Sequence, residues 1–74
     1  MNLDSIAQRL AQLDITITRT RGDTVRLSDE DMGTIGRAHI ADVAYALDAV
    51  DRLCGDSATF GHRYAVFHGR LRTI

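Results

Sequence analysis

The chain has 74 residues, a formal net charge of −1 and a single cysteine, Cys54. A chain of this length forms one domain over 1–74, and one thiol cannot make the intramolecular disulfides on which small secreted domains depend. A disulfide-stabilised scaffold is therefore excluded. Residues 1–13 contain no long apolar run, so we expect no signal peptide or membrane segment and predict a cytoplasmic location.

The amphipathic segment over 3–13 is the first predicted element. Its apolar residues recur at helical spacing, and they are Leu3, Ile6, Ala7, Leu10 and Leu13. Because the residues between them are mainly polar, the segment predicts a helix with one buried face. Asn2 is a suitable N-cap for this helix.

Alternation of apolar and polar residues over 15–20 and over 24–28 predicts a β-hairpin. A three-residue loop at 21–23 pairs Ile17 with Leu27 and Arg19 with Val25, which places the apolar residues of both strands on one face. A two-residue turn scatters them over both faces, so we predict the longer loop. The opposite face, which includes Arg26, then points toward solvent or a partner.

The segment after the hairpin has conflicting signals. Ser28 and Asp31 are typical of a helix start, but Gly33 and Gly36 disfavour a helix interior. Residues 29–36 are therefore expected to form either a short turn or the beginning of a continuous helix. A helix over 37–53 is predicted by its apolar stripe, with Gly55 as its C-terminal cap.

The C-terminal segment over 57–74 fits two structures. Apolar residues at steps of four and three predict a helix, and they are Phe60, Tyr64, Phe67, Leu71 and Ile74. Gly61 and Gly69 are poor helix residues, and the aromatic residues with Thr59, Val66 and Thr73 would also suit a strand. We predict the helix, and therefore an α+β fold of helix, β-hairpin, helix and helix.

Catalytic and metal chemistry are not predicted. The three histidines and one cysteine lack the short repeated spacing of metal ligands, and no glycine-rich phosphate loop is present. Cys54 falls on the apolar stripe of the 37–53 helix, where a thiol commonly acts as a small hydrophobic group. We expect no enzyme activity, no catalytic or metal site and no cofactor.

Charge is unevenly distributed along the chain and defines two candidate binding faces. Residues 29–56 carry a net charge of −5, whereas residues 57–74 contain no acid and carry +3. The predicted acidic face consists of Asp29, Glu30, Asp31, Asp42 and Asp48. The predicted basic face consists of Arg19, Arg21, Arg26, Arg63, Arg70 and Arg72. Small residues on the back of the last predicted helix, Ala58, Gly61, Ala65 and Gly69, offer a surface for a homodimer.

These features predict a non-enzymatic protein-binding module with another protein as its partner. Small inhibitors and adaptors of bacteria, phages and mobile elements have this character, and an anti-CRISPR-type role is an analogy that rests on small size and the lack of catalytic groups. The alternative is a small DNA- or RNA-binding transcriptional regulator that uses the arginines of the hairpin and the C-terminal segment. The sequence pI of about 6.2 argues against this alternative, because most such modules are basic.

Overall fold

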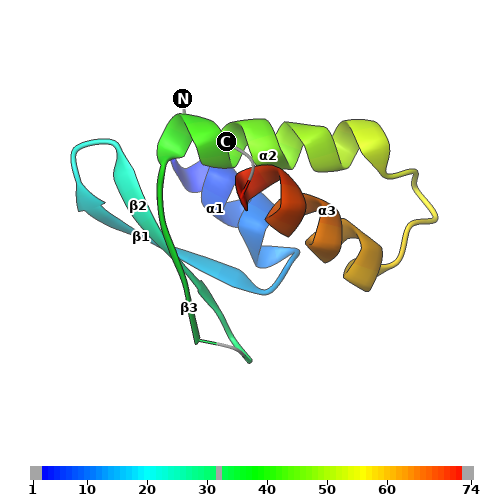
Figure 1. The fold of residues 1–74 in the computed structure, drawn as a ribbon, viewed down its shortest axis with the longest axis horizontal. Coiled ribbons are helices and arrows are strands. Elements are labelled where there is room, and N and C mark those ends of the chain that lie inside the picture. Colours follow the sequence, from blue (N-terminus) through cyan, green and yellow to red (C-terminus); the bar gives the residue numbers. More distant parts are fainter. Residues whose placement is uncertain (1–2, 32, 73–74) are drawn as a thin grey trace.

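A computed structural model describes residues 3–31 and 33–72, which form three helices and three strands (Figure 1). The elements are, in chain order, α1 (Leu3–Ala11), β1 (Ile15–Arg21), β2 (Thr24–Asp29), β3 (Gly33–His39), α2 (Ile40–Leu53) and α3 (Phe60–Arg72). The predicted α+β class is confirmed, and the C-terminal segment is a helix as predicted. Within the described ranges, no helix is long and apolar enough to cross a membrane.

The three strands form an antiparallel sheet in the order β1-β2-β3, and the helices pack on one of its faces (Figure 1). The predicted hairpin register is confirmed, because Ile17 lies opposite Leu27 and Arg19 lies opposite Val25. Leu27 and Val25 are buried on the face that contacts the helices. A shift by one residue would move these side chains to the solvent face, so burial fixes the register.

The turn between β1 and β2 is shorter than predicted. Arg21 belongs to β1 and pairs with Thr24, which leaves Gly22-Asp23 as a two-residue turn. The pairing shifts between Arg19 and Arg21, so Thr20 is an extra residue in β1. A bulge of this kind compensates for the short turn and keeps the apolar residues on the core face.

Strand β3 was not predicted, and our expectation of a turn or helix over 29–36 was wrong. Residues 33–39 pair with β2 along its second edge. Gly33 and Gly36 have φ values of 82° and 149°, which glycine adopts readily and an α-helix does not contain. The free edge of β2 also supplies hydrogen-bond partners that only the folded sheet provides.

Helix α2 consequently begins at Ile40, three residues after the predicted start. His39 caps it, because the imidazole Nδ1 accepts a hydrogen bond from the Ala41 backbone N–H at 3.1 Å. At the other end Cys54 is extended and donates its backbone N–H to the Val50 carbonyl at 2.9 Å. Gly55 is therefore not the cap that the sequence predicted.

Helix α1 ends at Ala11, two residues before its predicted end. Asp14 adopts a left-handed conformation with a φ of 57° and turns the chain into β1. Leu13 nevertheless remains buried in the core, as predicted. The predicted N-cap Asn2 and the predicted core residue Ile74 lie outside the described residues.

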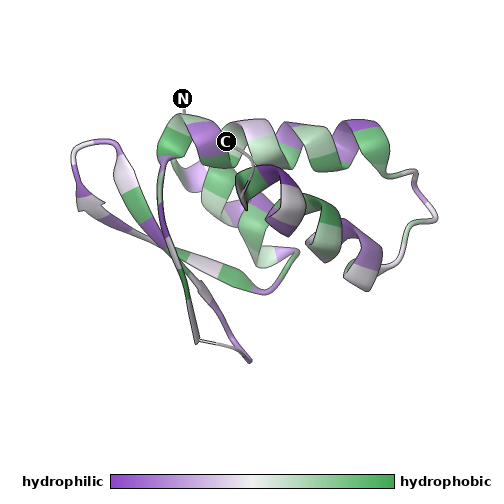
Figure 2. Ribbon diagram, in the orientation of Figure 1, coloured by the Kyte–Doolittle hydropathy of each residue, from purple (hydrophilic) through white to green (hydrophobic). Residues whose placement is uncertain are grey.

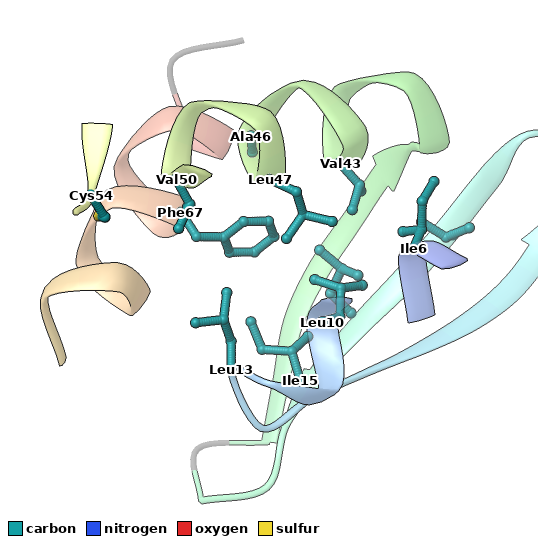
Figure 3. Close-up of a cluster of buried hydrophobic side chains, with 12 residues drawn as sticks. Ile6, Leu10, Leu13, Ile15, Val43, Ala46, Leu47, Val50, Cys54 and Phe67 are labelled. Carbon is teal, nitrogen blue, oxygen red and sulfur yellow. The ribbon is translucent and has the colours of Figure 1, made fainter. Parts of the chain in front are cut away.

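The core lies between the helices and the covered face of the sheet. Hydrophobic and hydrophilic residues alternate along the strands in Figure 2, as expected for a sheet with one covered face. Figure 3 shows side chains of all three helices converging, and the buried cluster comprises Ile6, Leu10, Leu13, Ile15, Val25, Leu27, Val43, Ala46, Leu47, Val50, Cys54 and Phe67. Phe67 is completely buried and is the largest of these side chains. It anchors α3 to the rest of the fold.

Candidate functional site

The helices leave one face of the sheet uncovered, and we call it the open face. The strand register assigns to it Thr16, Thr18 and Arg21 of β1, Thr24, Arg26 and Ser28 of β2, and Thr34, Arg37 and His39 of β3. All nine residues are exposed or half-buried. Each carries a hydroxyl, a guanidinium or an imidazole, so none of these nine described strand residues is acidic or apolar. The Asp23 carboxylate, in the hairpin turn, lies 3.9 Å from the His39 Nε2.

The open face has one arginine on each strand. Arg26 of β2 lies directly opposite Arg37 of β3 and opposite Thr18 of β1. Arg21 of β1 pairs with Thr24, one row closer to the hairpin turn. Like charges directly opposite each other in a sheet are destabilising, so this arrangement concentrates positive charge at a cost to stability.

Sequence reasoning missed Arg37 because it placed this residue at the start of a helix. In the structure it lies on the edge strand, beside Arg26. The β-favouring pair Thr34 and Ile35, between two glycines that disfavour a helix, was the signal that could have identified the strand.

The structure does not bring the six predicted basic residues together. Arg21 and Arg26 share the open face, but Arg19 is opposite Val25, on the alternate side of β1, where its Nε donates a hydrogen bond to the Gly22 carbonyl at 2.9 Å. Arg19 therefore supports the hairpin turn.

The other three predicted basic residues belong to α3. Arg63 donates hydrogen bonds to backbone carbonyls of the α2–α3 connection, at 2.9 Å to Gly55 and 3.3 Å to Ala58. Arg70 is exposed on α3. Arg72 is the last residue of the helix, and its side chain lies outside the described part of the chain.

The predicted acidic residues also separate into two groups. Asp29 is the last residue of β2, and Glu30 and Asp31 follow it toward β3; we call these three residues the acidic connection. The Asp29 carboxylate accepts a hydrogen bond from the Asp31 N–H at 2.8 Å. This acidic connection lies at the end of the sheet farther from the hairpin turn. Asp42 and Asp48 are on α2, so none of the five residues is on the open face.

Two acidic residues of α2 form ion pairs with an arginine of α1. The Arg9 guanidinium of α1 contacts Asp48 at 3.1 Å and Asp51 at 2.7 Å, both on α2. These ion pairs are solvent-exposed, so they contribute little stability. They do reduce the net negative charge of α2.

Tyr64 of α3 lies near the acidic connection. Its hydroxyl oxygen is buried, and no hydrogen bond of good geometry satisfies it within the described residues. A hydrogen bond of imperfect geometry to Asp29, followed by burial and the charges of Asp29 and Asp31, raises the pKa of Tyr64 from 10.0 to about 12. The folded protein therefore holds the phenolic proton more tightly than the unfolded chain.

This difference predicts a pH-dependent loss of stability that Tyr64→Phe removes. Below pH 10 the contribution of Tyr64 is fully present, and it is lost as the pH rises from 10.0 to about 12, because the unfolded chain releases the proton first. Urea denaturation across this range should show a decline in the free energy of unfolding that is smaller in the variant. An identical decline in both proteins would contradict the assignment.

A groove lies where the three helices meet. It has a volume of about 530 Å³ and is lined by Arg9, Gln12, Leu13, Leu47, Val50, Asp51, Phe60 and Arg63. Phe60, at its mouth, is 49% exposed, and Leu53 of α2 is 50% exposed. Four of the residues that line the groove are charged or polar and four are apolar.

The small residues predicted as a dimer surface are largely exposed. Gly61, Ala65 and Gly69 face solvent on α3, and a Cβ atom added at either glycine would meet no other atom within 4 Å. Packing inside the chain therefore does not require glycine at these positions.

Among the described residues, no three His, Cys, Asp or Glu side chains converge in a way that could hold a metal ion. Comparison of the chain with protein-family models, curated proteins and solved structures found no match.

Proposed function

We propose that the protein binds the phosphate backbone of nucleic acid through the open face, without catalysis. The observation that carries this proposal is the chemistry of the face, which has one arginine per strand, hydroxyl groups beside the arginines and no acid among its nine described strand residues. Guanidinium groups suit phosphate oxygens, and Ser and Thr hydroxyls commonly contact the backbone as well. The face therefore matches a polyanion in charge and in hydrogen-bonding capacity.

The low pI of the chain was an argument against nucleic-acid binding. The positions of the acidic residues weaken this argument. The acidic connection is at one end of the sheet, and Asp48 and Asp51 are paired with Arg9 on the helical side. Charges farther apart than about 8 Å are largely screened at physiological ionic strength. Besides Arg21, Arg26 and Arg37, a phosphate on the open face experiences Asp23, whose carboxylate lies 3.9 Å from the His39 Nε2.

The test is the double substitution Arg26→Gln with Arg37→Gln, compared with Arg52→Gln. Arg52 is an exposed arginine on α2, so its variant removes a positive charge away from the open face. We expect affinity for nucleic acid at low salt to fall about tenfold per lost contact in the double variant. The slope of log affinity against log salt should become less steep by about 0.9 per lost phosphate contact. Equal effects of the double variant and the control would contradict the proposal.

A second candidate is the protein-binding module predicted from the sequence, with an inhibitor or adaptor role that includes the anti-CRISPR-type analogy. The half-exposed Phe60 beside the groove favours it, because aromatic anchors dominate many protein interfaces. A second copy of the chain, contacting the exposed small residues of α3, is one form of this candidate. The absence of any salt-dependent binding to nucleic acid would make it the leading function.

A further inference from the structure

The proposed function leaves open which form of nucleic acid the open face recognises, and the placement of the aromatic residues bears on this question. The chain has four aromatic residues, Tyr45 on α2 and Phe60, Tyr64 and Phe67 on α3. None is on a strand. Proteins that bind single strands rely on aromatic side chains on which the bases stack. Among its described residues the open face therefore has no Phe, Tyr or Trp, and only the arginine planes and His39 could stack on unpaired bases.

His39 is the one ring on the open face, and its contacts restrict it. Its Nδ1 accepts the Ala41 N–H at 3.1 Å as the cap of α2, and its Nε2 lies 3.9 Å from an Asp23 carboxylate oxygen. These contacts orient the imidazole, and its side chain remains 52% exposed.

We infer, on the basis of the proposed function, that the open face binds a double-stranded nucleic acid along its phosphates. The three arginines span three strands, and the outer strands of such a sheet are about 10 Å apart. Groove widths of B-form DNA are about 6 Å and 12 Å, so arginines at this spacing can contact phosphates on both strands of a duplex. A single strand offers a lower charge density and fewer released counterions per contact.

The first experiment measures fluorescence anisotropy of the full chain with a labelled DNA duplex and with each of its separated strands at low salt. We expect the duplex to bind about tenfold more tightly than either strand. The Arg26→Gln, Arg37→Gln protein should lose duplex affinity, whereas Arg52→Gln should retain it. Equal or tighter binding of the single strands, still dependent on Arg26 and Arg37, would overturn this inference and leave the proposed function intact. If neither the duplex nor the single strands bind, both this inference and the proposed function are wrong.

A second experiment adds an aromatic side chain to the open face. Thr18 is exposed on the open face beside Arg26, and tyrosine is well tolerated in strands, so Thr18→Tyr should fold normally. Stacking on the new ring should raise single-strand affinity about tenfold and narrow the preference for the duplex. The control is Thr18→Val, which keeps the strand propensity but adds no ring. If single-strand affinity does not respond to the tyrosine, the absence of aromatic residues is not the basis of selectivity and the inference fails.

Discussion

Replacement of Phe67 by alanine is expected to remove a large part of the stability of the domain. Phe67 is 0% exposed and carries the contact of α3 with the core. Truncation of a buried phenylalanine costs about 3–5 kcal/mol, and a chain of this length has a total stability of about 4–11 kcal/mol. Denaturation by urea, followed by circular dichroism, should show a large fall in midpoint or no folded baseline.

The matched control for this change is Phe60→Ala, which makes the same substitution in the same helix. Phe60 is 49% exposed, so less apolar surface returns to water and the loss of stability should be much smaller. Equal losses in the two variants would show that α3 does not pack through Phe67.

Leu27→Ala is expected to have the second-largest effect, with a loss of about 2–5 kcal/mol. Leu27 is 1% exposed on the covered face of the sheet, opposite Ile17 of β1. Thr18→Ala, on the open face, should change the free energy of unfolding by no more than about 0.5 kcal/mol. A larger loss for Thr18→Ala than for Leu27→Ala in chemical denaturation would mean that the two faces are reversed.

The sequence was most informative where burial constrains the chain strongly. The register of Ile17 with Leu27 could be predicted because one alternative buries the apolar residues and the other does not. The turn could not be derived in the same way, because a bulge at Thr20 allows a shorter turn with an unchanged register. Strand β3 was missed because its pairing with β2 exists only in the folded sheet.

The candidate site could be predicted only in part, because neighbours in sequence are not neighbours in space. Arg21 and Arg26 were predicted as binding residues and share the open face, whereas Arg19 lies on the alternate side of its strand. Arg37 was absent from the predicted set because its strand was missed. Local charge sums identified acidic and basic segments, but strand alternation determined which side chains share a surface.

The order of the strands in the sheet has a consequence for how the chain folds. Because β1, β2 and β3 are neighbours both in sequence and in the sheet, each pairing closes only a short loop. The entropy cost of loop closure is small for such contacts, and topologies rich in local contacts fold quickly. The sheet can therefore assemble before Phe67, which follows it by 28 residues, reaches the core. We therefore expect the sheet to form first and α3 to dock afterwards.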